Sequence, residues 1–230
     1  MPPALDSLIE TFPALSAHGS FIAHGFVRRV PGVDVSLPKA EVLERLAPWH
    51  AAAVEALGFS QDRFFTAEQV HGAGIAVITE NAPRRSLNVD GFVTNVPGLL
   101  AGIHVADCGP VFILDPVRRA IALLHSGKKG AELGISSAAI RLMEECFGSR
   151  PADLVVQLGP CIRVPQYDVD FASRILADCR AAGVPSPQVH DCGTCTALHP
   201  DTYYSYRREL GKTGRLLALL GLKPATRPRE

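Results

Sequence analysis

Three short apolar runs follow one another over residues 99–125. Polar turns at Asp107–Pro110 and Asp115–Arg118 separate these runs. Short apolar runs bounded by Gly, Pro and Asp are typical of buried strands. After the third run, the glycine-bracketed turn Ser126–Gly130 precedes a helix-forming segment. The stretch therefore predicts three consecutive strands and a strand–turn–helix unit, whose backbone N–H groups can face an anion.

Other parts of the chain show the same alternation of apolar segments and turn residues. Further strands are predicted over Ser20–Val30, Phe64–Val70, Ile75–Thr79, Val89–Asn95, Asp153–Leu158 and Gly214–Gly221. Helical spacing and glycine stops predict helices over Pro38–Leu57, Ala131–Phe147 and Phe171–Ala182, with Pro200–Glu209 as a fourth. We expect Pro185–Thr196 to be a loop. Strands and helices in mixed order, without repeat or linker, predict one α/β or α+β domain over residues 1–230. Residues 1–18 are expected to form an N-terminal extension and residues 223–230 a flexible tail.

The composition narrows the function classes. The 230 residues suffice for a large core, and the 23 basic and 23 acidic residues give a formal net charge of zero. This balance argues against nucleic-acid or anionic-membrane partners. No apolar run is long enough to span a bilayer, and no signal peptide is expected at the N-terminus. The six cysteines are scattered, which is typical of reduced thiols in a cytoplasmic protein. We expect a monomer.

Three metal-capable side chains stand at the ends of predicted strands, namely His71, Cys108 and His125. Each is followed by a small residue: Gly72, Gly109 or Ser126. Two imidazoles and a thiolate suit zinc, with a fourth position for water or substrate, and copper accepts the same set. The alternative is that the histidines are polar strand ends and that Cys108 is buried core. Their separations exceed any local ligand motif, so the residues alone leave both interpretations open.

Other candidates are less specific. Cys192–Cys195 is a CxxC without a second pair, and a tight turn with buried thiols explains it as well as metal or redox use does. His104 shares the strand parity of Cys108 and could face the same site, or it could be an ordinary strand histidine. Tyr204–Arg208 could bind an anion through Arg208, or form the surface of a helix.

Several of these motifs occur in an order that resembles a known family. The motifs are Gln69–Gly72, Ala106–Cys108 with Pro110, His125–Gly127 with Gly130, Gly159–Ile162, Tyr167, Cys195–Thr196, Ser205–Arg208 and Thr213–Arg215. The family has been described as laccase-like polyphenol oxidases, as purine nucleoside phosphorylases and as peptidoglycan editing factors. The resemblance extends from about His24 to Leu220.

The resemblance implies a single-domain α/β/β/α sandwich with mixed sheets. It implies a zinc site at His71, Cys108 and His125, and phosphorolysis of adenosine, inosine and methylthioadenosine, with adenosine deamination also attributed to the family. The partners would be a purine nucleoside and phosphate. The predicted substrate- or phosphate-binding residues are Arg29, Lys128, Lys129, Tyr167 and Arg208. For deamination the H-x-E signature of other zinc deaminases is missing, so Asp107 or Asp90 would have to act as the general acid or base.

The chain departs from the family pattern near the expected substrate. The family has His-Ala-Gly-Trp-Arg-Gly where this chain has His125-Ser-Gly-Lys-Lys-Gly130. Lys129 supplies the charge of an arginine without its planar fork. Three other functions therefore stay open: a cysteine hydrolase that edits peptidoglycan precursors with Cys108 as nucleophile and His125 as base, a copper-dependent polyphenol oxidase, and a binding protein with a residual metal site.

Overall fold

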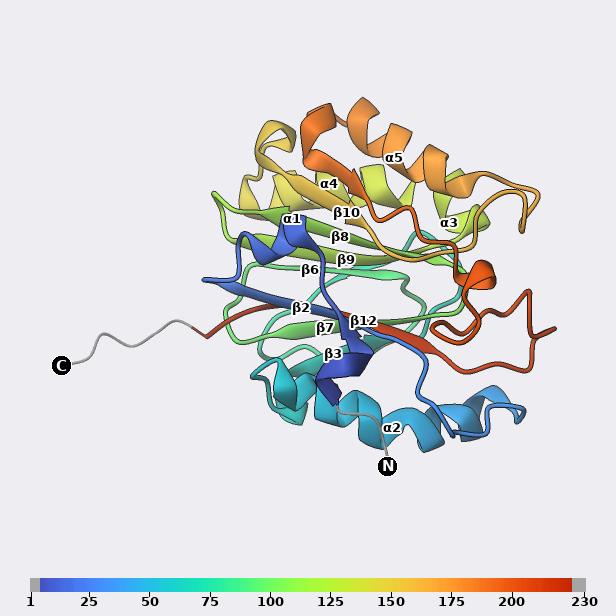
Figure 1. The fold of residues 1–230 in the computed structure, drawn as a ribbon. Coiled ribbons are helices and arrows are strands. Elements are labelled where there is room, and N and C mark those ends of the chain that lie inside the picture. Colours follow the sequence, from blue (N-terminus) through green and yellow to red (C-terminus); the bar gives the residue numbers. More distant parts are fainter. Residues whose placement is uncertain (1–4, 225–230) are drawn as a thin grey trace.

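Two six-stranded sheets form the centre of the molecule, and the computed structural model describes residues 5–224 (Figure 1). Sheet A has the order β1 (Ile9–Glu10), β2 (Ile22–Val27), β12 (Leu216–Leu222), β7 (Leu100–Val105), β3 (Phe64–Ala67) and β5 (Arg85–Ser86). Sheet B has the order β11 (Val189–Asp191), β10 (Val155–Leu158), β8 (Gly109–Asp115), β9 (Ala120–Ser126), β6 (Gly91–Thr94) and β4 (Ile75–Val77). Each sheet contains parallel and antiparallel pairs, so both are mixed.

Helices cover the outer face of each sheet. The helices on these faces are α2 (Lys39–Ala56), α3 (Lys128–Glu132), α4 (Ile135–Phe147) and α5 (Phe171–Ala181). The short helix α1 (Pro13–Ser16) contacts β2 of one sheet and β10 of the other, and its Leu15 belongs to the core between the sheets. Figure 1 shows α2 beneath sheet A and α3, α4 and α5 above sheet B. Short 3₁₀ turns lie at Leu5–Leu8, Gln61–Arg63, Pro151–Asp153, Ser186–Gln188 and Thr196–Leu198. The layers are helix, sheet, sheet and helix, which confirms the predicted α/β/β/α sandwich.

The central strands are apolar without interruption because both of their faces are covered. In β8, Val111 and Ile113 pack against the helices, while Phe112 and Leu114 belong to the core between the sheets. Strands buried on both faces have continuous apolar runs. The antiparallel register of β8 and β9 pairs Pro110 with His125. Cys108, just before β8, is thereby placed near the end of β9.

The predicted helix Ala131–Phe147 is divided in two. The helical backbone begins at Lys128, and α3 ends before Gly134, which has a φ of 71°. Glycine adopts this left-handed conformation without the steric cost that other residues carry. The chain therefore turns at Gly134 before α4 begins. Lys128 and Lys129 lie inside the first short helix rather than before it.

The prediction of a helix over Pro200–Glu209 was wrong, because this segment forms successive turns. Tyr203, Tyr204 and Ser205 are all buried, and a helix with one buried face cannot bury three consecutive side chains. The Glu209 carboxylate accepts a hydrogen bond from the Ser205 N–H at 3.0 Å. Such a side-chain bond satisfies a backbone group that a helix would otherwise use.

Two segments predicted to be irregular contain strands. The predicted loop Pro185–Thr196 contains β11, which pairs with β10 in parallel. In the predicted N-terminal extension, β1 pairs with β2, and Phe12 and Leu15 are buried. Most of the predicted tail, residues 225–230, lies outside the described residues, as do residues 1–4.

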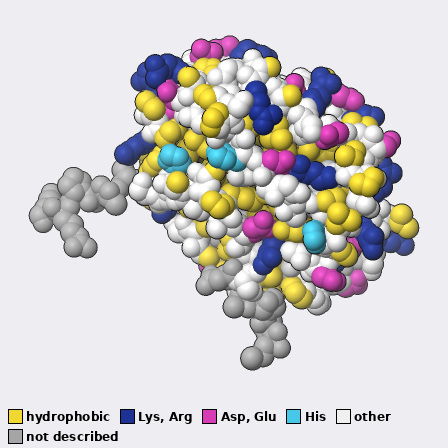
Figure 2. Space-filling view, turned by 45° about the horizontal axis from the view of Figure 1, so that its top comes forward, with side chains coloured by type: hydrophobic (Ala, Val, Ile, Leu, Met, Phe, Trp, Pro, Cys, Tyr) yellow, Lys and Arg dark blue, Asp and Glu magenta, His cyan; other side chains and the backbone are white. Residues whose placement is uncertain are grey.

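The described surface is mixed in charge. Figure 2 shows basic and acidic side chains interspersed over one face of the molecule. None of the helices within residues 5–224 combines the length and the apolar character that crossing a bilayer requires.

Candidate metal centre

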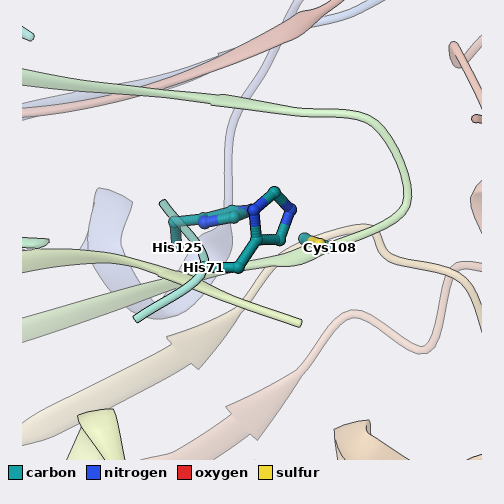
Figure 3. A group of neighbouring side chains, drawn as sticks. All are labelled: His71, Cys108 and His125. Carbon is teal, nitrogen blue, oxygen red and sulfur yellow. The ribbon is translucent and has the colours of Figure 1, made fainter. Parts of the chain in front are cut away.

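His71, Cys108 and His125 meet at one end of the sandwich. His71 follows β3, Cys108 lies between β7 and β8, and His125 belongs to β9. Their ligand atoms all lie within 4.8 Å of one another (Figure 3). The two imidazole rings are 4.7 Å apart between centroids and lie edge to face. The structure thus brings together the three side chains that the sequence could not show to be neighbours.

The local backbone allows His71 and Cys108 to approach each other closely. His71 has a φ of 59°, in the left-handed region that non-glycine residues seldom adopt. The Gln69 amide, two residues before it, bonds both the N–H and the carbonyl of His104 at 2.9 and 2.7 Å. This pair continues the contact of β3 with β7. A Cβ on Gly127 would lie 2.5 Å from the Cys108 sulfur, so only glycine leaves room for the thiol.

A fully buried carboxylate, Asp90, holds two of the three candidate ligands. Its Oδ1 lies 2.7 Å from His125 Nδ1 and accepts a hydrogen bond from the His71 N–H at 2.9 Å. Its Oδ2 accepts from the N–H groups of Gly72 and Val70. With Nδ1 engaged, Nε2 is the nitrogen that His125 has left for a metal. A carboxylate behind a metal-binding histidine fixes the tautomer and orientation of the ring.

The electrostatics favour the thiolate form of Cys108. Burial opposes the charge, but hydrogen bonds with His125 and His71 outweigh it and lower the pKa of Cys108 to about 6. Burial likewise opposes the imidazolium of His125, but its bonds with Asp90 and Cys108 raise its pKa to about 9. Thiolate is the form of cysteine that binds metals.

These observations fit a metal site. Two nitrogens and one sulfur within reach of one ion, with a buried carboxylate behind them, match three-ligand zinc sites that keep a fourth position open. The same donors suit copper. A metal could be held by His71, Cys108 and His125.

A cavity of about 820 Å³ opens beside the three ligands. The predicted site residues that line it are His71, Asp107, Cys108, His125, Lys128, Lys129 and Tyr167. Asp107 has both carboxylate oxygens engaged: Oδ1 accepts from the Thr196 hydroxyl at 2.6 Å and Oδ2 from the Arg207 N–H at 2.7 Å. The carboxylate therefore fastens the turn before Cys108 to the segment 205–211.

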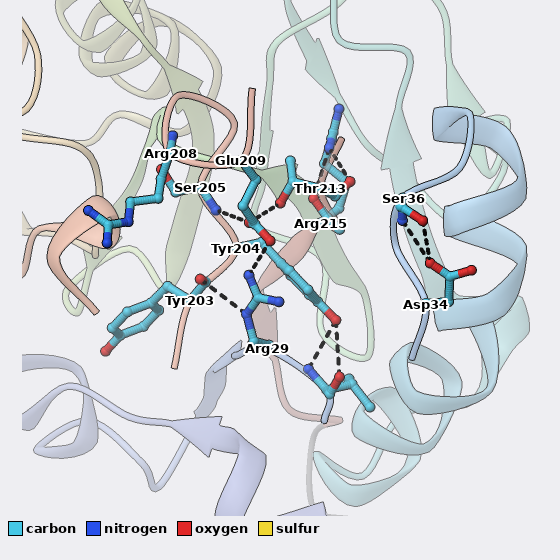
Figure 4. Close-up of polar contacts among 12 residues, drawn as sticks. Arg29, Asp34, Ser36, Tyr203, Tyr204, Ser205, Arg208, Glu209, Thr213 and Arg215 are labelled. Atoms are coloured by element: carbon cyan, nitrogen blue, oxygen red, sulfur yellow. Dashed lines mark hydrogen bonds and ion pairs between the residues drawn. The ribbon is translucent and has the colours of Figure 1, made fainter. Parts of the chain in front are cut away.

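Two predicted phosphate-binding residues do not line the cavity. Arg29 forms an ion pair with Glu209 at 2.6 Å, and its guanidinium lies 4.4 Å from the centroid of the Tyr204 ring (Figure 4). Glu209 and Tyr204 therefore hold the Arg29 guanidinium away from the cavity lining. Arg208 is exposed, and the cavity instead includes its neighbour Arg207, whose guanidinium lies 4.9 Å from the centroid of the Tyr167 ring.

The cavity also contains residues that sequence reasoning missed. These are Lys39, Gln69 and Arg215, which line the side formed by sheet A and α2 together with His104, a residue that the strand parity had already suggested. Gln69 and Arg215 stand in motifs of the family resemblance, which gave a signal for them. Lys39 had no such signal. His104 does reach the cavity, but its ring lies 5.3 Å from that of His50 on α2, and it is not in the metal-capable group.

The CxxC pair lies apart from the metal-capable group. Cys195 is buried, and its backbone forms an isolated parallel β-bridge with that of Cys161, while Cys192 is half-buried; the thiols of all three are free. Within the described residues neither belongs to a group that could hold a metal ion.

Comparison with known proteins identifies the family. The sequence model of the family described as "Multi-copper polyphenol oxidoreductase laccase" matches residues 33–176 and 165–223. The chain belongs to this family. A relative in Deinococcus radiodurans, named purine nucleoside phosphorylase, is 32% identical over 91% of this chain and 93% of its own length. Purine nucleoside phosphorylase YlmD of Geobacillus stearothermophilus is 27% identical over 89% of this chain and 87% of its own length.

Solved structures share the fold of this chain. The crystal structure of YlmD from Geobacillus stearothermophilus matches with a TM-score of 0.77 at 22% identity, over 94% of this chain and 99% of that one. The Bacillus licheniformis hypothetical protein YfiH matches with a TM-score of 0.76 at 23% identity, over 88% of this chain and 93% of that one. At these identities the likeness concerns the fold.

Proposed function

We propose that this protein is a zinc-dependent purine nucleoside phosphorylase that acts on adenosine, inosine or methylthioadenosine. The observation that carries the proposal is the convergence of His71, Cys108 and His125 at the wall of a cavity that also holds lysines. The names of the relatives support the reaction class. Adenosine deamination by the same site, a cytoplasmic location and a monomeric state belong to the same proposal.

In phosphorolysis a phosphate oxygen attacks the anomeric carbon of the sugar. The glycosidic C–N bond breaks, and its electron pair leaves with the purine. Zinc, when bound, would supply a Lewis acid against developing negative charge. The work of the protein is to position the two reactants and to stabilise charge.

The residues around the cavity fit these tasks. Lys128 and Lys129 follow His125 closely and would attract and orient phosphate. Tyr167 and Phe171 form an aromatic wall, with ring centroids 6.0 Å apart and an interplanar angle of 72°, that could cover the purine. Asp107 would act as a positioning residue, because its Oδ2 ties Arg207 and its Oδ1 ties Thr196 to the turn before Cys108.

The test is a panel of adenosine, inosine and methylthioadenosine, each incubated with zinc-loaded protein in the presence and absence of phosphate. We expect free base and sugar 1-phosphate in equal amounts, formed only with phosphate. Base released equally fast without phosphate would indicate a hydrolase and overturn the proposal. Assays with copper and a phenol test the oxidase alternative in the same preparation.

A cysteine hydrolase is the second candidate, because the side chains of Cys108, His125 and Asp90 form a hydrogen-bonded row in space. The His125 ring lies between the thiol and the carboxylate, as in a nucleophile–base–carboxylate arrangement. Alkylation distinguishes the two. A zinc-bound thiolate resists iodoacetamide, whereas a hydrolase nucleophile is alkylated in the protein as isolated, and its amidase activity disappears with it.

A further inference from the structure

The charge of the cavity is strongly one-sided. Its lining includes the cations Lys39, Lys128, Lys129, Arg207 and Arg215. Among the described lining residues the carboxylate is Asp107, and both of its oxygens are already engaged. The cations come from two sides. Lys128 and Lys129 belong to α3 above sheet B, whereas Lys39 begins α2 and Arg215 precedes β12 of sheet A (Figure 1).

Arg215 is half-buried and lacks an ionic partner. Its Nη1 donates to the carbonyls of Thr213 and Gly214 at 3.1 and 2.8 Å (Figure 4). Within residues 5–224 it forms no ion pair, and its Nε and Nη2 make no hydrogen bond with the protein. The two carbonyl contacts fix the guanidinium at the cavity wall while leaving donors free for a ligand.

Burial lowers the pKa of Arg215 and outweighs the attraction of Tyr206, Cys108 and Asp107, none of which forms an ion pair with it. Burial lowers the pKa of His104 to about 3 and that of His50 to about 4, so both imidazoles are neutral. Burial and then the charge of Arg215 lower the pKa of Lys39. His50 is almost wholly buried, and its Nε2 has no hydrogen-bond partner. A partly desolvated cation without an ion-pair partner is costly, and two neighbouring cations repel each other.

We propose that Arg215 and Lys39 form a subsite for a phosphate group, on the sheet A side of the cavity. The free donors of a fixed guanidinium match two oxygens of one phosphate group, and Lys39 adds a second positive charge at the rim. A dianion there would offset the repulsion between the two cations. Arg215 and Lys39 come from other elements than Lys128 and Lys129 of the same cavity. The subsite rests on the proposed function and deepens it, because it gives a phosphate group a defined position.

Two sources can supply this group. One is inorganic phosphate, the second substrate of phosphorolysis. The other is a 5′-phosphate carried by the nucleoside, in which case the protein accepts nucleotides. The chemistry at Arg215 and Lys39 is the same for both, and the ligand used in the experiment separates them.

The experiment is calorimetric titration of zinc-loaded protein with inorganic phosphate, adenosine and adenosine 5′-monophosphate. The variants are Arg215→Gln and Lys39→Met, with Lys212→Met as a matched control on an exposed lysine outside the cavity. Lys39 is exposed at the start of α2, so Lys39→Met tests the subsite even where Arg215→Gln fails to fold.

We expect both subsite variants to weaken binding of one phosphate-bearing ligand at least tenfold, while Lys212→Met binds as the wild type does. If inorganic phosphate is the ligand affected, the subsite holds the second substrate. If the monophosphate binds tenfold more tightly than adenosine and the variants abolish this advantage, the subsite holds a nucleotide. Unchanged affinity of both ligands in both variants would overturn the subsite. That result leaves phosphorolysis untouched, whereas phosphate binding without phosphorolysis would overturn the proposed function alone.

Discussion

Gly127 determines at the scale of a single residue whether Cys108 can face its partners. A methyl group at this position would lie 2.5 Å from the sulfur, which real Cβ atoms do not tolerate. We therefore expect Gly127→Ala to displace Cys108 and to lose most of its zinc by elemental analysis. Gly130→Ala is the matched control, because its Cβ would come no closer than 3.4 Å to a neighbour. Full zinc occupancy in Gly127→Ala would contradict the position assigned to Cys108.

Asp90 would not bind the metal itself, but it orients the ligands His125 and His71 by hydrogen bonds. Asp90→Asn keeps the shape but replaces an acceptor oxygen by a donor against His125 Nδ1 or the backbone N–H groups. We expect zinc affinity to fall about 10–100-fold. Competition with a chromogenic chelator measures this, with the exposed Asp201→Asn as control. Equal affinity in Asp90→Asn and wild type would show that the carboxylate does not orient the ligand.

Lys129 is the position where the family pattern has arginine. A guanidinium binds two phosphate oxygens at once, while an ammonium offers charge on a flexible stem. We expect Lys129→Arg to improve the use of phosphate by about 1 kcal/mol, seen in the phosphate KM and in kcat/KM. If Lys129→Arg and Lys129→Ala both leave these constants unchanged, the side chain faces solvent and has no part in phosphate binding.

At the scale of elements, the turns of residues 203–213 depend on Glu209. Burial raises its pKa, but bonds from Arg29, Thr213 and the Ser205 N–H outweigh this and hold the pKa below its ordinary value of 4.5. A carboxyl with a lowered folded-state pKa stabilises the fold above the unfolded value, and the effect is lost as pH falls through the folded value.

We therefore expect Glu209→Gln to lower the free energy of unfolding by about 2 kcal/mol at neutral pH. The difference from wild type should shrink as the pH falls below about 4.5, the ordinary value. Denaturant titrations between pH 3 and 7 measure it, with exposed Glu144→Gln on α4 as control. A difference that stays constant with pH would mean that the ionised carboxylate is not the stabilising form.

The elements themselves were largely predictable where packing and local sequence agree. The runs that became β7, β8 and β9 are apolar because both faces are covered, and the sequence shows this directly. The sequence pattern did not predict the helix break at Gly134, because a single glycine is tolerated within a helical pattern and only tertiary packing selects its left-handed conformation. The sequence did not predict the turns at residues 200–209, because burial of Tyr203, Tyr204 and Ser205 depends on partners far along the chain, which hydrophobic periodicity does not reveal.

At the scale of the whole molecule, the site exists because two sheets end together. The β8–β9 hairpin makes Cys108 and His125 neighbours, and its short turn makes that pairing foreseeable. His71 comes from beyond β3 of the other sheet, so only the stacking of the sheets brings it into range. Spacing in the sequence carries no such information. The same stacking joins Arg215 and Lys39 to the cavity of the metal centre.

The central claim is that one metal ion at His71, Cys108 and His125 supports phosphate-dependent cleavage of a purine nucleoside. The most direct measurement titrates zinc into metal-free protein while the formation of sugar 1-phosphate from inosine is followed. We predict that the rate rises in proportion to zinc, stops rising at one zinc per chain, and stays at background for Cys108→Ala. A rate that does not depend on zinc, or that Cys108→Ala reproduces in full, would contradict a metal-supported phosphorolysis at this site.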